Sequence, residues 1–430
     1  MTTERHQAVR GMNDILPQQL IYWQAIERQF QQIVASYGYQ ELRFPIVEKT
    51  VLFKRSIGEV TDIVAKEMYS FNDRNGDSLT LRPEGTAVCV RAGLEHNLLY
   101  NQIQRFWYMG PMFRHERPQK GRYRQFHQIG VEAFGMQGSA IEFEHLLLTA
   151  RLWQALGVDK RVQLQINSLG TLAARARYRI CLQSYWQEYL HLLDEDGRMR
   201  LKNNPLRILD NKDPALQNII RQAPSLLDYL DEESLQKFQE LQSLLTAAKI
   251  NYVVNPRLVR GLDYYTQTVF EWTCEELGAQ TAVCAGGRYD GLVEQLGGKM
   301  TPACGFAIGM ERLVSLYAES VRAEDLCKLP DIYVISLGEE AQQIKYLLVE
   351  RWRDVLPNLH AVMDCVGGSL KNQLKRASKA RARFAVIIGN EEIQNQRISV
   401  KELAKPEEPQ ILLTDAELLE RLKTALVSSN

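Results

Sequence analysis

The chain has 430 residues, of which 45% are hydrophobic and 24% are charged. These proportions are ordinary for a soluble globular protein with a hydrophobic core, and the length predicts roughly two to three domains at about 150 residues each. Lysine plus arginine and aspartate plus glutamate both total 52, so the formal net charge is zero. This balance argues against a protein that coats nucleic acid nonspecifically, although a neutral chain can still bind RNA through local basic patches.

The seven cysteines are scattered, odd in number and never spaced as C-x-x-C. This argues against a disulfide framework and against a structural zinc site, and it favours the reduced thiols of a cytosolic protein. No apolar run approaches the ~20 residues that span a membrane. The N-terminal stretch MTTERHQAVRGMNDILP lacks the apolar segment of a secretory signal, so we expect a cytoplasmic protein.

The first part of the chain predicts a helix followed by strands joined in hairpins. The expected elements are a helix over 18–38, a strand over 39–48, a hairpin around the turn pair Asn75-Gly76, a helix over 84–100, and two long strands at 104–114 and 125–135. Sequential strands joined by hairpins predict an antiparallel sheet. This argues against a doubly wound nucleotide-binding fold.

The second part predicts a helical insertion and then a separate small domain. Residues of about 171–250 are rich in Leu, Gln, Glu and Arg at helical spacing. The later elements are strands within 251–256, 263–273 and 281–291, a helix from near Gly309, a linker over 318–330, strands within 331–338, 360–365 and 384–390, and helices over 339–355 and 369–380. The final alternation predicts a mainly parallel sheet. We therefore expect an α+β domain at 1–325 and an α/β domain at 326–430.

The most informative stretch is 106–132, where two apolar strands enclose a basic loop. Arginine at a strand end presents a rigid donor fork to phosphate oxygens, and Phe126 just after the loop can stack on a base. A solvated basic hairpin is the alternative, but Gln128 and Glu132 are four residues apart and share one face of the strand. The loop holds Arg114, Arg117, Lys120, Arg122 and Arg124, with Glu116 among them.

Four other stretches carry weaker signals, each with a plain structural alternative. Glu84 and Thr86 mark a strand-to-helix transition, where a carboxylate could bind a substrate ammonium group or simply be favoured by the helix dipole. Arg260 lies in LVRGLDYYT, which is also typical of a plain sheet strand with aromatic cross-strand pairs. An unpaired guanidinium within such an apolar strand is costly, so we expect Arg260 to meet an anion. Gly286-Gly287 allows close backbone approach to a ligand or simply a tight turn. Small residues lead from 305 into a helix whose first turn carries Arg312, and the alternative is helix–sheet packing with a solvated arginine.

Together these stretches supply several arginines, a few carboxylates and an aromatic shelf. They offer no activated serine or cysteine nucleophile and no cluster of metal ligands. The set suits phosphate chemistry driven by positioning and charge stabilisation. It does not suit covalent catalysis.

At these residues the sequence closely resembles the bacterial-type histidyl-tRNA synthetases, a family of class II aminoacyl-tRNA synthetases. The resemblance covers essentially the whole chain, from RGMNDILP at 10–17 onward. RFPIVE with Pro45 resembles motif 1, the dimer-interface element; FRHE with the loop to Phe126 resembles motif 2; GFAIGMERL resembles motif 3. LVRGLDYYT and AGGRYDGL resemble the two histidine-specific signatures of the family.

The resemblance implies roles for individual residues. Arg114, Arg260 and Arg312 would be catalytic. Histidine would be bound by Glu84, Gly85, Thr86, Arg114, Gln128, Glu132, Arg260, Tyr264 and Tyr265. ATP would be bound by Arg114, Glu116, Arg122, Phe126 and Arg312, and the acceptor end of the tRNA would be met by Arg117, Gln119 and Arg124.

It also implies a fold and an activity. The expected fold is a class II catalytic domain on an antiparallel sheet with a helical insertion, followed by an α/β anticodon-binding domain. The expected reaction activates histidine with ATP, with Mg²⁺ carried on the ATP phosphates, and transfers it to its tRNA. A cytoplasmic homodimer is expected. In the last domain, KNQLKRASKARAR at 371–383 carries six basic residues, which suit either RNA phosphates or an ordinary solvated helix face.

Two other functions are consistent with parts of this pattern. A synthetase-like paralogue without charging activity could sense histidine as a regulatory subunit of the enzyme that opens histidine biosynthesis. Such paralogues typically lack the anticodon domain and lose catalytic arginines, whereas Arg114, Arg260, Arg312 and a C-terminal α/β block are present here. A plain RNA-binding scaffold explains the basic loops but gives no reason for Glu84, Gln128 and Glu132 beside them.

Overall fold

A computed structural model of the chain describes residues 6–427 except 59, 60, 62, 120, 212, 279, 280 and 406. The chain divides into two compact units, Met1–Asp325 and Leu326–Asn430. The division falls within the stretch 318–330 that the sequence predicts to be a linker, and this stretch also contains a short helix, α11 (Ala323–Leu326).

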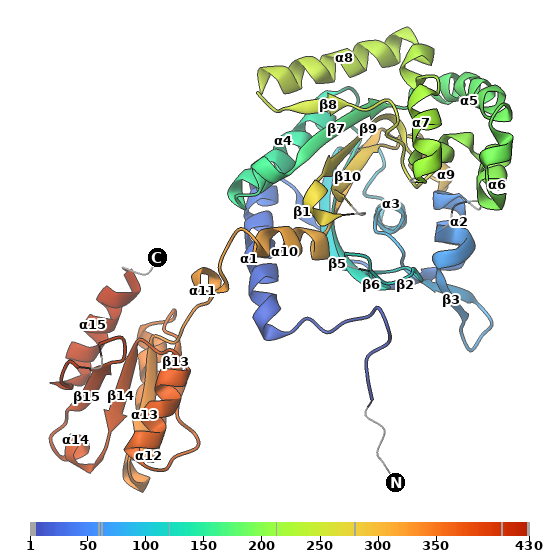
Figure 1. Ribbon diagram of the computed structural model, residues 1–430. Helices are drawn as coiled ribbons and strands as arrows, with labels where there is room; N and C mark the ends of the chain where they lie inside the picture. Colours follow the sequence, from blue (N-terminus) through green and yellow to red (C-terminus); the bar gives the residue numbers. More distant parts are fainter. Residues whose placement is uncertain are drawn as a thin grey trace. The chain divides into compact units, whose positions relative to one another are not determined.

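The first unit is built on an eight-stranded mixed sheet (Figure 1). Its order is β1 (Gln40–Glu41), β5 (Gln104–Phe113), β6 (Gln125–Phe134), β11 (Ala303–Gly309), β10 (Ala282–Arg288), β9 (Thr266–Thr273), β7 (Gln163–Ser168) and β8 (Tyr252–Val254). The strands from β5 to β7 are antiparallel, as predicted. The edge strands β1 and β8 run parallel to their neighbours, because long crossovers, one of them the helical insertion, separate each pair.

A second, three-stranded sheet has the order β2 (Val47–Lys49), β4 (Ser78–Leu81) and β3 (Tyr69–Asn72). The hairpin predicted around Asn75-Gly76 is confirmed as β3 and β4. The single strand predicted over 39–48 is wrong, because β1 and β2 belong to different sheets. Pro45 lies between them, and proline has no N–H to continue a strand ladder.

Helices cover both faces of the large sheet. Helix α3 lies in the hollow of the curved sheet, while α1, α4 and α10 lie on the opposite side (Figure 1). The helix predicted to reach residue 100 ends at Glu95. The helical segments outside the insertion are α1 (Pro17–Ser36), α2 (Thr50–Ile57), η1 (Ile63–Glu67), α3 (Thr86–Glu95), α4 (Ala140–Ala155), η2 (Asp159–Arg161), η6 (Glu275–Leu277), α9 (Leu292–Gln295) and α10 (Met310–Ala318).

Strand β11 was not predicted, although it is central to the sheet. Its sequence, ACGFAIG, consists of small and apolar residues without polar alternation. Such a short run is buried on both faces and cannot be told from a loop or helix segment by periodicity. The following helix, with Arg312 in its first turn, is confirmed as α10.

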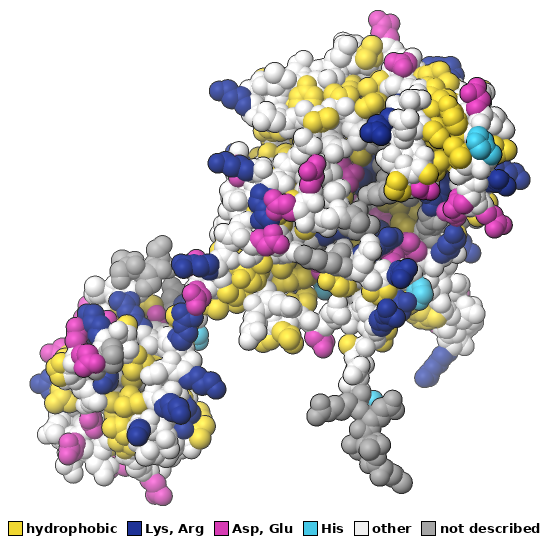
Figure 2. Space-filling view, in the orientation of Figure 1, with side chains coloured by type: hydrophobic (Ala, Val, Ile, Leu, Met, Phe, Trp, Pro, Cys, Tyr) yellow, Lys and Arg dark blue, Asp and Glu magenta, His cyan; other side chains and the backbone are white. Residues whose placement is uncertain are grey.

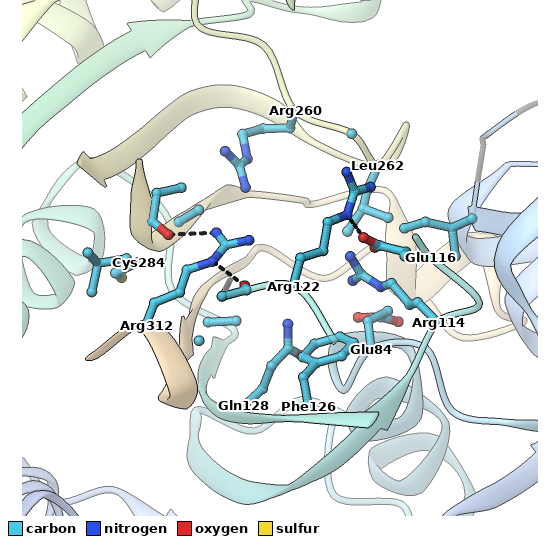
Figure 3. Close-up of a pocket in the computed structure, with 18 of the residues that line it drawn as sticks. Glu84, Arg114, Glu116, Arg122, Phe126, Gln128, Arg260, Leu262, Cys284 and Arg312 are labelled. Atoms are coloured by element: carbon cyan, nitrogen blue, oxygen red, sulfur yellow. Dashed lines mark hydrogen bonds and ion pairs between the residues drawn. The ribbon is translucent and has the colours of Figure 1, made fainter. Parts of the chain in front are cut away.

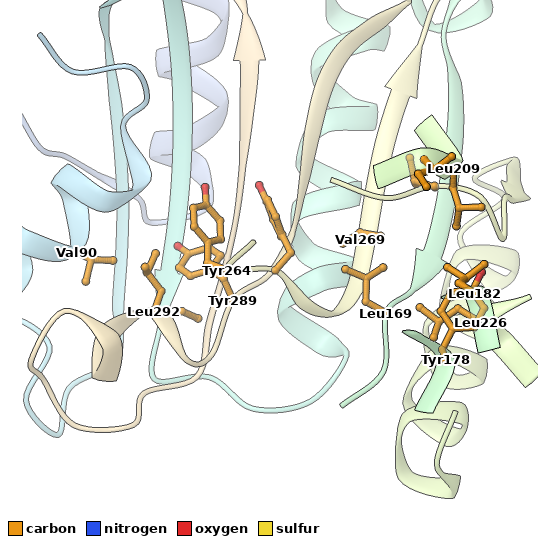
Figure 4. Packing of buried hydrophobic residues seen from close by; sticks show 14 of the residues in the cluster. Val90, Leu169, Tyr178, Leu182, Leu209, Leu226, Tyr264, Val269, Tyr289 and Leu292 are labelled. Atoms are coloured by element: carbon orange, nitrogen blue, oxygen red, sulfur yellow. The ribbon is translucent and has the colours of Figure 1, made fainter. Parts of the chain in front are cut away.

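The helical insertion is confirmed. It consists of α5 (Leu172–Gln187), η3 (Leu190–Leu192), α6 (Glu195–Asn203), η4 (Pro205–Asp210), α7 (Pro214–Gln222), η5 (Leu226–Tyr229) and α8 (Glu232–Ala247). Side chains of Thr171, Asp194 and Asp231 accept hydrogen bonds from the first turns of α5, α6 and α8, which fixes where these helices begin. Buried residues of the insertion, such as Tyr178 and Leu182, belong to one apolar cluster with residues of the sheet (Figure 4).

The second unit has a five-stranded sheet with the order β13 (Ala361–Met363), β12 (Ile332–Ser336), β14 (Phe384–Ile388), β15 (Ile398–Glu402) and β16 (Ile411–Leu413). The first three strands are parallel, as predicted, whereas the last two were not predicted and are antiparallel. The helices are α12 (Glu339–Val355), α13 (Leu370–Lys379), α14 (Asn390–Gln394) and α15 (Asp415–Val427).

Acidic and basic side chains are interspersed over the face of the molecule shown in Figure 2, in keeping with the zero net charge. Of the helices described, none combines the length and the apolar composition needed to cross a membrane. Within the described ranges, no three His, Cys, Asp or Glu side chains are grouped so that they could hold a metal ion.

A buried ion pair joins α4 to the end of β10. Arg288 Nε lies 2.6 Å from Glu142 Oε1, and both side chains are about 5% exposed or less. Glu142→Ala leaves the buried guanidinium with Asp290, 3.0 Å away, as its remaining carboxylate partner, so we expect a loss of stability of about 3 kcal/mol, the low end of the cost of breaking a buried pair. Differential scanning calorimetry checks this as a lower unfolding temperature. Lys237→Ala, which removes only an exposed pair with Glu233, should cost less than about 1 kcal/mol; equal shifts in the two variants would contradict the expectation.

Candidate functional site

A cavity of about 500 Å³ opens over the centre of the large sheet (Figure 3). It is lined by β6, β10, β11, the first turn of α10, the loop before β9, the loop after β5 and the start of α3. Four arginines that the sequence singled out face this one space: Arg114, Arg122, Arg260 and Arg312. Of the other predicted residues, Glu84, Thr86, Glu116, Phe126, Gln128, Tyr264 and Tyr265 also line it.

Strand β6 supplies the floor. Phe126 and Gln128 are two residues apart on this strand, so both side chains point to the same face of the sheet, which is the face of the cavity. Gln128 lies between Gly110 of β5 and Gly309 of β11 in the register, so neither neighbour covers it with a side chain. Its Oε1 is buried and accepts no hydrogen bond from the residues described. Because buried polar atoms are normally paired, this acceptor is suited to a ligand donor.

Arg114 follows directly on the last residue of β5. Its Nε donates to the carbonyl oxygen of Pro83 at 2.9 Å, and its guanidinium lies over the Phe126 ring, 5.2 Å from the centroid. Burial lowers the pKa of Arg114, and the carboxylates of Glu67 and Glu84 oppose that shift. An arginine held in this way stays charged and presents its remaining N–H groups to the cavity.

Arg122 lies in the loop between β5 and β6. Its guanidinium forms an ion pair with Glu116 and lies 3.7 Å from Glu67. The backbones of Gln119 and Arg122 exchange hydrogen bonds at 2.9 and 3.0 Å, so the tip of the loop is a tight turn. The Glu116 carboxylate, predicted to bind ATP, is therefore engaged by Arg122 in this structure.

Arg312 reaches the cavity from the opposite side. Its Nε donates to the Gly121 carbonyl at 3.0 Å and its Nη1 donates to the Ala282 carbonyl at 2.7 Å. Burial lowers the pKa of Arg312, and the nearby charge of Arg114 lowers it further. These two hydrogen bonds fix the direction of the guanidinium toward the site.

Arg260 lies in the loop before β9, so its predicted place in an apolar strand is wrong; β9 begins only at Thr266. The strand does not extend further back, since residues 261–264 form bends and a turn. Arg260 does meet an anion, as expected: Nη1 lies 3.1 Å from Glu271 Oε2. Its guanidinium also lies 5.9 Å from the centroid of the Tyr265 ring.

Glu84 combines the two roles that the sequence left open. Its Oε2 accepts from the Thr86 N–H at 2.7 Å and its Oε1 accepts from the Ala87 N–H at 2.9 Å, so it caps α3. It also lines the cavity, and burial raises its pKa. Gly85, which was predicted to bind histidine, is not among the lining residues. Gly85 and Gly130 both pack against the Tyr108 ring, where an added Cβ would lie 2.1 and 2.0 Å, respectively, from ring atoms.

Glu132 lies behind the lining residues, within a set of hydroxyl groups. Its Oε1 accepts from Thr86 Oγ1 at 2.7 Å and from Tyr108 OH at 3.0 Å, and its Oε2 accepts from Tyr289 OH. Burial raises the pKa of Glu132 to about 8, although the three hydroxyls oppose the shift. Sequence reasoning missed Tyr108, because it lies in an apolar run where a tyrosine is typical of the core, and it missed Tyr289, although this residue lies within AGGRYDGL.

The loop residues predicted to meet tRNA differ in exposure. Arg117 and Gln119 are exposed. Arg124 is partly buried; its Nε donates to the Glu116 carbonyl at 3.2 Å, and its backbone N–H donates to Gly11 at 2.7 Å. Arg124 therefore braces the loop, while Lys120 lies outside the described residues.

In the second unit, the basic residues of the stretch 371–383 differ in their surroundings. Arg376 forms a double hydrogen bond with Asp364, at 2.7 and 3.0 Å, so it is engaged within the unit. The other five basic residues are exposed: Lys371, Lys375, Lys379, Arg381 and Arg383. Lys371, Lys375 and Lys379 recur every four residues, which places them on one side of α13.

Comparison with known proteins gives matches over both units. The sequence profile of the family described as Histidyl-tRNA synthetase matches residues 11–313, and the profile described as Anticodon binding domain matches residues 331–424. Among solved structures, the apo histidyl-tRNA synthetase of S. aureus is 34% identical with a TM-score of 0.80, over 97% of this chain and 100% of that chain.

Two more distant structures share the fold. A histidyl-tRNA synthetase from Nostoc is 18% identical with a TM-score of 0.69, over 98% of this chain and 100% of that chain. A protein from Bacillus halodurans, described as an ATP phosphoribosyltransferase regulatory subunit/histidyl-tRNA synthetase, is 21% identical with a TM-score of 0.61, over 89% of this chain and 97% of that chain.

The raised pKa of Glu132 predicts a pH dependence of stability. Its pKa is about 8 when folded against an ordinary 4.5, so the folded state holds a proton that the unfolded state has released. Stability from this group is therefore full below about pH 4.5 and is lost as the pH rises toward about 8. In thermal unfolding scans, wild type should lose stability relative to Glu132→Gln across this window. The exposed-site control Glu294→Gln should show no such divergence, and parallel profiles for all three proteins would contradict the expectation.

Proposed function

The chain belongs to the histidyl-tRNA synthetase family, and from this membership we propose that it is an ATP-dependent histidine–tRNA ligase. The observation that carries the proposal is the single cavity in which Arg114, Arg260 and Arg312 face Glu84 and Gln128. Cations suited to a triphosphate and acceptors suited to an amino acid's ammonium group thus share one space. A volume of about 500 Å³ is in the range of sites for small molecules.

In the proposed first step, a carboxylate oxygen of histidine attacks the α-phosphorus of ATP. A new oxygen–phosphorus bond forms, the bond to the β-phosphate oxygen breaks, and pyrophosphate leaves. No protein base is needed, because the carboxylate is already ionised at neutral pH. Arg114 and Arg260 would stabilise the charge that builds on the α-phosphate, and Arg312 would bind the γ-phosphate. Mg²⁺ carried on the triphosphate would supply further charge neutralisation.

Recognition of histidine would divide between its two ends. Glu84, Thr86 and Gln128 would hold the α-ammonium group, for which the unpaired Gln128 Oε1 is a ready acceptor. Tyr264 and Tyr265 would line the imidazole pocket, with Glu132 behind them. A site that hydrogen-bonds the imidazole leaves buried polar groups unpaired when an apolar amino acid enters, so selection should be strong without editing.

In the proposed second step, a ribose hydroxyl at the tRNA 3′ end attacks the carbonyl carbon of the adenylate. An ester bond forms, the bond between the carbonyl carbon and the phosphate oxygen breaks, and AMP leaves with the proton of the hydroxyl on its phosphate. The exposed Arg117 and Gln119 would approach the acceptor end, with Arg124 bracing the loop, and the second unit would bind the anticodon. We include a cytoplasmic homodimer in the proposal, supported by the resemblance of RFPIVE to the dimer-interface motif of the family.

A non-charging paralogue that senses histidine is the alternative, since one structure with the same fold is described as a regulatory subunit/histidyl-tRNA synthetase. A sensor needs the histidine pocket but has no use for arginines aimed at a triphosphate. The convergence of Arg114, Arg260 and Arg312 on the cavity, and the match to an anticodon-binding domain over 331–424, favour the ligase.

The proposal is tested by exchange of labelled pyrophosphate into ATP, measured without tRNA for each of the twenty amino acids. We expect exchange with histidine alone. Measurable histidine binding without exchange for any amino acid would replace the ligase with the sensor. Exchange with several amino acids would contradict the proposed selective recognition of the imidazole.

Removal of the Arg260 guanidinium should slow the first step. We expect Arg260→Ala to lower the rate of histidine-dependent exchange on the order of 10² to 10³-fold, because its charge is used where negative charge develops. ATP binding, followed by equilibrium titration, should change little, since Arg114 and Arg312 remain. Arg322→Ala, at an exposed position paired with Asp325, is the control, and an Arg260→Ala rate within twofold of this control would refute the assignment.

A further inference from the structure

The helical insertion is joined to the loop that carries part of the histidine pocket. Residues 260–265 form this loop, which we name the pocket loop; Arg260, Leu262, Tyr264 and Tyr265 within it line the catalytic cavity. The loop has no strand or helix of its own. Its position therefore depends on the groups that hold its backbone from outside.

Arg207, on η4 of the insertion, holds the first part of the pocket loop. Its Nη2 donates to the Gly261 carbonyl at 3.0 Å and to Asp263 Oδ1 at 3.1 Å. The Arg207 side chain is 13% exposed and the Asp263 side chain is 39% exposed, so these bonds lie at the border with solvent. Asn204, just before η4, adds a hydrogen bond from Nδ2 to the same Asp263 oxygen at 3.1 Å.

Arg175, on α5 of the insertion, holds the other end of the loop. Its Nη1 donates to the Tyr265 carbonyl at 2.8 Å. Arg175 and Arg207 thus bind backbone carbonyls on the two sides of Tyr264. Charged donors make stronger hydrogen bonds than neutral ones, and a carbonyl held by a fixed guanidinium cannot shift without breaking that bond.

The insertion contacts the pocket loop through hydrogen bonds more than through packing. A second cavity, of about 720 Å³, is lined by Arg175, Asn204, Arg207 and Asp263, so the loop and the insertion face each other across a hollow. Behind the loop, the insertion and the sheet share one apolar cluster that includes Tyr178, Leu258 and Tyr264 (Figure 4). The insertion is therefore anchored to the catalytic unit and can serve as a fixed support.

We propose that Arg207 and Arg175 are positioning residues for histidine activation: they act from the insertion, through the backbone of the pocket loop, on Arg260, Tyr264 and Tyr265. The inference rests on the proposed ligase function. It assigns the insertion a part in the first step, before any tRNA is bound. Neither arginine lines the catalytic cavity, so neither acts on the substrate directly.

The test is steady-state pyrophosphate exchange without tRNA, with histidine and ATP varied separately, for wild type, Arg207→Ala and Arg207→Lys. We expect Arg207→Ala to lower kcat/KM for histidine by about 10- to 100-fold, with a raised KM for histidine, because small displacements of positioned groups are costly. The KM for ATP should change little, since Phe126 and Arg312 lie on β6 and α10. Arg207→Lys should recover part of the loss, as one donor remains.

Arg177→Ala is the matched control. Arg177 is also an insertion arginine that donates to a backbone carbonyl, but that carbonyl belongs to Tyr229 within the insertion, at 3.1 Å. Its loss should leave both KM values unchanged. A second check is the double variant of Arg207→Ala with Asp263→Asn, whose effects should be less than additive because the two residues share one contact.

Three results would overturn the inference. The first is an Arg207→Ala enzyme with the same kinetics as Arg177→Ala. The second is a fall in kcat alone with both KM values unchanged and a lower unfolding temperature, which indicates only a smaller folded fraction. If Arg207→Ala does not fold, Asn204→Ala and Arg207→Lys carry the same test, and an unchanged KM for histidine in both is the third. Absence of exchange in wild type would instead refute the ligase proposal itself.

Discussion

The central constraint in this structure is the need to hold like charges together without substrate. Arg114, Arg122, Arg260 and Arg312 face one cavity of about 500 Å³, and their mutual repulsion opposes that arrangement. Each guanidinium is held by specific acceptors: the Pro83, Gly121 and Ala282 carbonyls and the carboxylates of Glu116 and Glu271. A site arranged in advance for negative charge needs little reorganisation when that charge develops.

The sheet provides the rigidity that this arrangement needs. Antiparallel pairing of β6, β11 and β10 fixes Gln128 beside Gly309 and leaves the floor open to a ligand. Behind the floor, the Glu132 carboxylate and its three hydroxyl partners form a buried, hydrogen-bonded polar group. On the far side, arginines of the insertion bind the backbone of the pocket loop. The cavity is thus held by the sheet, by α3 and by the insertion together.

Much of this could be predicted from the sequence, because the strongest signals are local. The two long strands, the hairpin at Asn75-Gly76 and the insertion follow from alternation, turn chemistry and helical spacing. Strand β11 could not be predicted, since a short run of small residues has no period. The Arg207 and Arg175 contacts were equally hidden, because an arginine that bonds a distant carbonyl looks like any solvated helix residue. Tyr108 looks like an ordinary core residue in its apolar run, and only the fold places it and Tyr289 around the Glu132 carboxylate.

The proposed function requires that one cavity bind histidine and the α-phosphate of ATP together. Calorimetric titration with a non-hydrolysable sulfamoyl analogue of histidyl-adenylate tests this most directly. A site built for the reaction should bind the joined molecule at least 10²-fold more tightly than histidine or ATP alone, as expected for a compound that resembles the reacting state. The same analogue carrying alanine in place of histidine should bind far more weakly. Affinity for the histidine analogue no greater than for histidine itself would contradict the claim.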